Sequence, residues 1–434
     1  MKRIIIGLLA SVICSACSIN QKMAKQVSRQ FDKPAITNQY HAGFALYDLQ
    51  AKKMIYEKDA DRYFVPASNT KLYTFYAGLK MLGDSIPALR YVERGDSLIF
   101  WGTGDPSFLE NQLKSDRAVT FLRNSPKKLF FAAGRYTGNF YGNGWSWDDF
   151  NDYYQPEISE FPIQDNMITF SAVNGKLKVV PASLNNCVIK DTTANQANFR
   201  VARLYDQNLF RYPDMPVPAD YRQYVPYKTS TVMTINLLTD NLKKPVSLVN
   251  MKMPEDAKTL YSVKTDSVLK AMMLPSDNFI AEQLLLVYSN AIGTELNGVK
   301  AIEHIRQKYL SNLPGNPSWI DGSGLSKGNL FSPRDMVSVL DSIYHTVNDQ
   351  KRLFDMLPAG GKSGTLKNAY PKTDQPFVYG KTGTLSGVHN QSGYVLTKKG
   401  KVLIYSFMNN NYVLPTAEVR KEMGRVVSYI HEHF

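Results

Sequence analysis

Both ends of the chain have hydrophobic patterns that predict strands. Residues 43–48 alternate loosely between apolar and polar positions, and a polar turn separates them from a second short run at 54–58, which indicates a hairpin. Near the other end the pattern predicts three further strands and a closing amphipathic helix, at 375–383, 391–397, 401–409 and 415–434. Helical periodicity dominates two segments between these ends, 256–310 and 332–357.

The central stretch, residues 89–250, has a different pattern. Short apolar runs such as SLIFWG, KLFFAAG and MITFSAV are separated by Gly, Asn, Asp and Pro. Short strands between turn-forming residues are typical of β-rich domains. We therefore expect accessory β-rich structure at 89–252, inserted into a domain that is split between 24–88 and 253–434.

The first 17 residues have the pattern of an export signal. The run MKRIIIGLLASVICSAC has a basic start, a short apolar stretch and small residues that precede Cys17. We expect residues 1–17 to be a lipoprotein signal that is cleaved just before Cys17, which then carries the lipid, and we expect a periplasmic protein tethered to a membrane. Cys14 stands where such signals usually have leucine, so simple secretion remains the alternative.

Composition narrows the class of partner. The chain has 434 residues, 44% of them hydrophobic, which is enough for at least two folded domains. Its net charge of +13 suits anionic polymers or membrane surfaces, but no compact Lys/Arg cluster indicates a nucleic-acid partner. After cleavage Cys187 is the one thiol besides Cys17, so we expect no disulfide framework. The six histidines lack metal-site spacing, so we expect no metal and no cofactor.

Three S-x-x-K pairs occur in the chain, and one of them has the context of a catalytic pair. Ser125 is followed by Pro126 in a polar turn, and Ser267 lies in a predicted helix where its pair would be exposed. Ser68 and Lys71 lie at the start of a predicted helix, where positions i and i+3 face the same way. Taken alone, this motif also fits an ordinary helix-start serine beside a surface lysine.

Two further motifs follow in order along the chain. Ser276–Asn278 reads S-x-N before a predicted helix, and Lys381–Gly383 reads K-T-G on a predicted strand. Each has an ordinary explanation, as a helix cap or a strand end. A second K-S-G at 362–364 follows two glycines and lacks a preceding strand, so we prefer Lys381. The ordered set of S-x-x-K, S-x-N and K-T-G is typical of penicillin-recognising serine enzymes.

The chemistry explains why two lysines are needed. A serine hydroxyl is a weak nucleophile without a base, so Lys71 must be neutral to activate Ser68. Its ordinary pKa of about 10.4 must fall to near neutrality, at a cost of about 4 kcal/mol. Burial lowers the pKa of a lysine, and so does a second cation such as Lys381.

The S-x-N motif supplies two side chains that can assist this pair. We expect Ser276 to relay a proton between Lys71 and the leaving nitrogen. We expect Asn278 to hold both Lys71 and an amide group of the substrate.

The K-T-G strand supplies the groups that hold the reacting part of the substrate. Lys381 and the hydroxyl of Thr382 can attract a carboxylate, and Gly383 can let the substrate backbone lie close to the strand. The backbone N–H groups of Ser68 and Thr384 are the expected oxyanion donors, and one such donor contributes roughly 100–1,000-fold in rate.

Beyond the motifs, the sequence resembles the D-alanyl-D-alanine carboxypeptidase/endopeptidase family S13, the class C low-molecular-weight penicillin-binding proteins. The resemblance covers roughly residues 35–434 and rests on PASNTKL, GTGDPSF, GNGWSWDDF, WIDGSGLS and YGKTGTLSGV. It implies an α/β (α+β) fold of the β-lactamase/transpeptidase type, with a five-stranded antiparallel sheet flanked by helices. The sheet would take strands from both ends of the chain.

The resemblance also implies an activity. Ser68 would attack the D-Ala-D-Ala carbonyl of peptidoglycan stem peptides, releasing D-alanine, and the same site would open cross-links as an endopeptidase. β-Lactam antibiotics would act as acylating inhibitors. Asp149, in GNGWSWDDF, would bind the amino end of diaminopimelate; the alternative is a helix-capping acid.

Two other functions remain open at this point. A class A β-lactamase needs a glutamate with asparagine four residues later, and Glu282, Glu295 and Glu303 lack one. The 208 positions between Ser68 and Ser276 also exceed the spacing of a compact β-lactamase. A catalytically silent, wall-binding lipoprotein is the second alternative, although such a protein has no need for both lysines.

Overall fold

The computed structural model describes residues 21–32, 35–110, 112–193 and 197–434. The expected export signal and Cys17 lie outside the described residues. Within these ranges, no helix combines the length and the apolar character that a membrane span needs.

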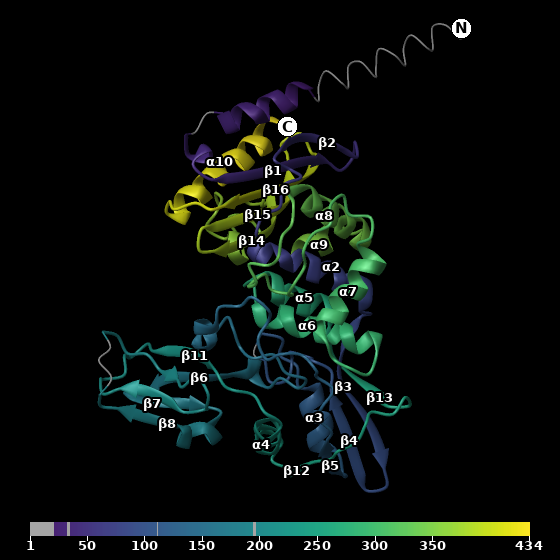
Figure 1. Ribbon diagram of the computed structural model, residues 1–434, viewed down its shortest axis with the longest axis vertical. Coiled ribbons are helices and arrows are strands. Elements are labelled where there is room, and N and C mark those ends of the chain that lie inside the picture. The colour runs from purple at the N-terminus through teal and green to yellow at the C-terminus, as the bar shows by residue number, and fades with distance from the viewer. Residues whose placement is uncertain (1–20, 33–34, 111, 194–196) are drawn as a thin grey trace.

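A five-stranded antiparallel sheet joins the two ends of the chain, which confirms the expected fold class (Figure 1). Its strand order is β14-β15-β16-β1-β2. The bounds are β1 (His41–Asp48), β2 (Lys53–Lys58), β14 (Val378–Leu385), β15 (Val388–Leu396) and β16 (Val402–Asn410). β1 pairs with β16 along its whole length, from His41 opposite Asn410 to Asp48 opposite Leu403.

Helices cover both faces of this sheet, as Figure 1 shows. On one face α10 (Thr416–His433) and the helical residues 21–32 bury apolar side chains against β1 and β16. The other face carries α2 (Lys71–Met81), α5 (Thr265–Met273), α6 (Asn278–Ile292), α7 (Gly298–Tyr309), α8 (Pro333–Val347) and α9 (Gln350–Asp355).

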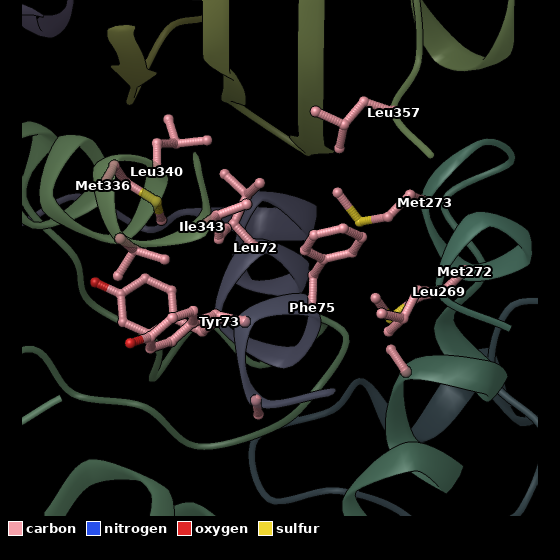
Figure 2. Packing of buried hydrophobic residues seen from close by; sticks show 14 of the residues in the cluster. Leu72, Tyr73, Phe75, Leu269, Met272, Met273, Met336, Leu340, Ile343 and Leu357 are labelled. Atoms are coloured by element: carbon pink, nitrogen blue, oxygen red, sulfur yellow. The ribbon is translucent and has the colours of Figure 1, made fainter. Parts of the chain in front are cut away.

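The first of these helices, α2, lies at the centre of the larger hydrophobic core. Most of its residues are apolar, and the first eight, Lys71 to Gly78, are all buried, as expected for a helix in the middle of a core. Figure 2 shows Leu72, Tyr73 and Phe75 between side chains of α8 and α5. Because α2 begins at Lys71, this packing also fixes the backbone of the S-x-x-K motif.

The insert contains a second five-stranded sheet and two three-stranded sheets, with strand orders β12-β5-β4-β3-β13, β11-β6-β7 and β8-β10-β9. Their bounds are β3 (Ser85–Arg94), β4 (Ser97–Gly102), β5 (Lys128–Phe131), β6 (Met167–Val173), β7 (Lys176–Val180), β8 (Val188–Asp191), β9 (Ala202–Arg203), β10 (Phe210–Pro213), β11 (Arg222–Pro226), β12 (Val246–Leu248) and β13 (Lys258–Lys264). The apolar runs quoted above form β4, β5 and β6. Two helices that the sequence did not predict, α3 (Arg117–Asn124) and α4 (Thr231–Leu242), pack against these strands.

One strand of the insert lies where the sequence predicted a helix. Residues 258–264 form β13, which pairs antiparallel with β3 and completes the insert's larger sheet. The helical interpretation of 256–310 is therefore wrong for this segment. The expected domain boundary at 88 falls inside β3, and the expected boundary at 253 lies before β13, so β13 had been assigned to the split domain. The partner of β13 is far away in sequence, so the local pattern could not reveal it.

Hydrogen bonds join the insert to α6, the helix that begins with Asn278. The buried guanidinium of Arg135 donates within the insert to Gly102 O at 2.5 Å. It also donates to Asn290 Oδ1 of α6 at 2.9 Å and, just beyond that helix, to Thr294 O at 2.8 Å. Charged donors of this kind make stronger hydrogen bonds than neutral ones. The insert is thus anchored to the C-terminal end of α6, the end opposite the S-x-N motif.

Candidate active site

Ser68 lies on a tight turn immediately before α2. The turn is a 3₁₀ helix, η2 (Ala67–Thr70), and Ala67 has a φ of +47°. Holding a non-glycine residue in this left-handed backbone conformation costs roughly 1–3 kcal/mol, and such strain is often found at active sites. The turn directs Ser68 Oγ toward Lys71, whose Nζ is 3.0 Å away.

Lys71 is fully buried and has three oxygen partners. Besides Ser68 Oγ, its Nζ lies 2.6 Å from Asn278 Oδ1 and 2.7 Å from Ser323 O. Burial lowers its pKa to about 8, although the nearby carboxylates of Asp277, Asp321 and Glu282 act in the opposite direction. About one tenth of Lys71 is therefore neutral at pH 7, and this neutral form is what a lysine base requires.

The S-x-N segment divides its three residues between the site and the helix. Asp277 caps α6, because its Oδ1 accepts a hydrogen bond from Ile280 N at 2.8 Å. Ser276, with a φ of +66°, and Asn278 contact the two lysines. The Asn278 amide also donates to Tyr154 O of the insert at 3.0 Å, so one of its two donors is occupied.

Lys381 extends from β14 toward the same point. Its Nζ lies 2.7 Å from Ser276 Oγ and 2.7 Å from Thr382 O. Burial, and then the charge of Lys71, lower the pKa of Lys381 well below its ordinary value. The lysine of the second K-S-G motif, Lys362, is exposed and lies outside this network.

Gly383 has a different neighbour from the one we expected. A methyl group at this position would lie 2.4 Å from Pro66 O and 2.8 Å from Ser68 N. The missing side chain therefore lets the turn that carries Ser68 approach β14, rather than making room for substrate. This approach brings the Ser68 N–H beside the strand that carries Thr384, as two oxyanion donors require.

A loop that motif analysis did not assign to the site lies behind Lys71. Its residue Ser323 accepts the hydrogen bond from Lys71 through its backbone carbonyl. The loop is held by Glu282 of α6, which accepts hydrogen bonds from Ser323 N at 2.7 Å and Gly322 N at 3.1 Å. The run DGSGLS contributed to the family resemblance, but its contact with Lys71 spans 252 positions and has no local signal.

The same loop also supports the turn that carries the nucleophile. Gly324 has a φ of +87°, and a methyl group added to it would lie 1.9 Å from Ala67 O. Asp321 fixes this conformation by accepting hydrogen bonds from Gly324 N and Ser326 N, at 2.8 and 2.7 Å. The loop and the catalytic turn are thus packed backbone against backbone.

Two clefts meet at the nucleophile, and both are lined by Ser68, Ser276 and Thr384. A cleft of about 850 Å³ faces the insert and is lined by Asn278 and by Asp149 of η3 (Trp147–Asn151), among others. A cleft of about 740 Å³ runs past Thr382 toward α10. The structure therefore brings all nine predicted site residues to one place, with Asp149 along the wall of the first cleft.

Comparison with known proteins identifies the family. Residues 23–430 match the D-Ala-D-Ala carboxypeptidase 3 (S13) family. The chain belongs to this family. The S13 membership confirms the resemblance inferred from the motifs, because the match spans both parts of the split domain and the insert.

Individual relatives agree with the S13 assignment. The chain is 24% identical to D-alanyl-D-alanine carboxypeptidase DacB of Haemophilus influenzae over 432 residues, covering 90% of this chain and 89% of the relative. The crystal structure of penicillin binding protein 4 from Haemophilus influenzae has a TM-score of 0.73 at 21% identity, covering 94% and 99% of the two chains. Its complex with a β-lactam has a TM-score of 0.67 at 21% identity, with the same coverage. These structures show that the fold is shared.

Proposed function

We propose that this protein is a penicillin-sensitive serine D-Ala-D-Ala carboxypeptidase that also opens peptidoglycan cross-links. The observation that carries the proposal is the pairing of two buried lysines with two serines. Lys71 contacts Ser68 and Asn278, while Lys381 contacts Ser276. Membership of the S13 family and the likeness to a D-alanyl-D-alanine carboxypeptidase support the same activity.

Acylation begins with neutral Lys71. The lysine takes the proton of Ser68 Oγ, and the oxygen attacks the carbonyl carbon of the penultimate D-alanine. Charge develops on the carbonyl oxygen, where the N–H groups of Ser68 and Thr384 stabilise it. Burial supports this role, because it disfavours the charged form of the lysine.

Collapse of this intermediate breaks the C–N bond. The leaving nitrogen receives the proton that Lys71 took, relayed through Ser276 Oγ, and D-alanine departs. Its carboxylate is held by Lys381 and Thr382 until then. A bound carboxylate favours the protonated form of Lys381, which in turn keeps its neighbour Lys71 neutral. Water then attacks the ester and gives a proton to Lys71, which passes it to Ser68 Oγ as that oxygen leaves the shortened peptide.

The same attack explains sensitivity to β-lactams. Ser68 opens the lactam ring, and the leaving nitrogen stays attached to the acyl group and blocks the approach of water. We therefore expect a long-lived acyl-enzyme. The relative that has been solved with a β-lactam bound supports this expectation.

Export and membrane attachment are a further part of the proposal. The pattern of residues 1–17 supports export to the periplasm, and Cys17 supports attachment through a lipid. Fractionation of cells that express the wild type and Cys17→Ser tests the attachment. We expect the wild type in the membrane fraction and the variant in another fraction; equal distribution would refute lipid attachment.

Labelling with a fluorescent penicillin tests the catalytic proposal. We expect a lasting label on the peptide that contains Ser68, located by mass mapping, and no label in Ser68→Ala. Ser267→Ala is the matched control, because Ser267 belongs to an S-x-x-K pair that is exposed on α5. Label on another serine would refute Ser68 as nucleophile, and rapid loss of label with hydrolysed penicillin would identify a β-lactamase. Folded protein without label would indicate a silent binding protein.

A further inference from the structure

The cleft beside α10 has chemistry that release of D-alanine alone does not explain. We propose that this cleft binds the leaving stem peptide of a cross-linked substrate through carboxylates remote from the scissile bond. The inference rests on the proposed function and deepens it. It assigns the binding to the side chains of Lys367, Arg420 and Lys421.

The position of the cleft links it to the leaving group. Thr382 lines the cleft toward α10 but not the cleft on the insert side. Asn278 lines the cleft on the insert side but not the one toward α10. In the proposed reaction Asn278 holds the acyl part of the substrate, and Thr382 with Lys381 holds the carboxylate next to the departing amine. A peptide that crosses Ser68 therefore places its leaving part in the cleft toward α10.

The size of the cleft exceeds what D-alanine needs. Its volume of about 740 Å³ lies in the range that accommodates a ligand of drug size. Besides Thr382, its lining includes Lys367 and, on α10, Arg420 and Lys421. Free D-alanine held at Thr382 would leave the part of the cleft at these cations unused, whereas a stem peptide extends through it.

The two clefts differ in the balance of their charged residues. The cleft on the insert side is lined by one lysine, Lys327, and by five acidic residues, Glu110, Asp148, Asp149, Asp165 and Asp277. The residues that line the cleft toward α10 include three cations and no acid. Lys367, Arg420 and Lys421 are exposed, and none forms an ion pair within the described ranges of the chain. Their charges are thus available to an anionic ligand.

The positive field extends inward along the cleft. His389, on its inner wall, is buried, and its Nδ1 lies 2.8 Å from Thr384 Oγ1. Burial, and then the charges of Arg420 and Lys381, lower the pKa of His389 to about 3. The imidazole therefore stays neutral, and the cations on α10 act on the same space as Lys381.

A stem peptide has the complementary chemistry. When D-alanine leaves, it carries one carboxylate, which Lys381 and Thr382 accept. When a second stem leaves a cross-link, it carries the equivalent carboxylate on its diamino acid and further carboxylates along its length. Single exposed ion pairs contribute little, so we expect the three cations to act together and a combined substitution to have the larger effect.

The experiment compares two reactions of the same enzyme. Release of D-alanine from a pentapeptide and cleavage of a cross-linked muropeptide dimer are measured for the wild type and for the double variant Arg420→Gln/Lys421→Gln. We expect the ratio of kcat/KM for the dimer to kcat/KM for the pentapeptide to fall about tenfold, equivalent to about 1.4 kcal/mol. Lys351→Gln, an exposed lysine of α9 away from the cleft, should leave the ratio at the wild-type value.

A chemically modified substrate separates charge from other effects. When the remote carboxylates of the leaving stem are amidated, the wild type and the double variant should cleave the dimer with equal ratios. The inference would be overturned if the double variant kept the wild-type ratio with the unmodified dimer. It would also be overturned if the ratio fell as much with the amidated dimer as with the unmodified one. Wild-type release of D-alanine without dimer cleavage would overturn it too, while leaving the carboxypeptidase in place. Absence of both reactions and of penicillin label would instead reject the proposed function.

Discussion

Lys71 and Asn278 lie 207 positions apart in the sequence, yet Lys71 Nζ is only 2.6 Å from Asn278 Oδ1. The contact gives a buried lysine an acceptor without a negative charge. A carboxylate in the same place would hold the proton on Lys71, because a neighbouring anion favours the charged form of an amine. The asparagine therefore positions the base and leaves it free to lose its proton.

Substitution of Asn278 by aspartate tests this argument. An adjacent opposite charge changes a pKa by roughly 1–3, so we expect Asn278→Asp to lower the rate of penicillin acylation at pH 7 about a hundredfold. The pH dependence should move to higher pH, since Lys71 would lose its proton later. The rate of labelling by fluorescent penicillin between pH 6 and 10 measures both effects. Asn186→Asp, an exposed change in the insert, is the control, and an unshifted profile in Asn278→Asp would contradict the argument.

The wild-type enzyme should show the pH dependence of a lysine base. Burial lowers the pKa of Lys71 to about 8, and the deprotonated form is the active one. The acylation rate should therefore rise with pH, by about tenfold between pH 7 and pH 9, and then level off. Time courses of penicillin labelling at constant ionic strength measure the profile. A rate that is flat or falls over this range would show that Lys71 is not the base.

Gly324 should be intolerant of a side chain. Alanine at this position would lie 1.9 Å from Ala67 O and would have to adopt a φ of +87°. We expect Gly324→Ala to displace the turn that carries Ser68, to lower acylation at least tenfold and to destabilise the fold by about 3 kcal/mol.

A second glycine separates strain from displacement. Gly400 has a similar φ of +79° and no neighbouring atom within 4 Å of the added methyl group. Gly400→Ala should cost only about 1 kcal/mol and leave acylation unchanged. Thermal denaturation and labelling of both variants measure these effects, and equal behaviour of the two would refute the proposed contact between the loop and the catalytic turn.

Asp149 should contribute to recognition of an amine on the substrate. It lies on the wall of the cleft that also contains Asn278. The pKa of the Tyr154 hydroxyl is raised mainly by burial and then by the negative charge of the Asp149 carboxylate. We expect Asp149→Asn to raise KM for diaminopimelate-containing peptides about fivefold, since one exposed charge pair contributes about 1 kcal/mol. The same peptide with its side-chain amine acetylated is the control. If KM for the free amine stayed at the wild-type value, Asp149 would have no such role.

The sequence predicts the site better than it predicts what supports the site. The strands of the main sheet and the three motifs follow from local periodicity and spacing, so they could be placed without a structure. The support of Lys71 by Ser323 and Glu282 depends on contacts between distant segments, which periodicity does not encode. The same limitation explains the strand at 258–264, whose partner β3 lies about 170 positions earlier.

Gly383 illustrates a different limitation. Its occurrence in K-T-G identified the motif correctly, but the physical reason for a glycine could be judged only once its neighbours were known. The neighbouring atoms belong to Pro66 and Ser68, so the residue serves the assembly of the protein itself. Motif recognition therefore located the residue, and geometry supplied its role.

The pairing of β1 with β16 has a consequence for biogenesis. During synthesis from the N-terminus, the hairpin of β1 and β2 emerges early. The second strand that pairs with β1, which is β16, is among the last segments to appear. Lys381, on β14, also arrives after the entire insert. The nascent chain must therefore keep an unpaired strand edge in solution until nearly all of it has been made, which exposes it to misassembly. We expect maturation of this enzyme to depend on chaperones that protect that edge, and a prematurely terminated product to be inert toward penicillin.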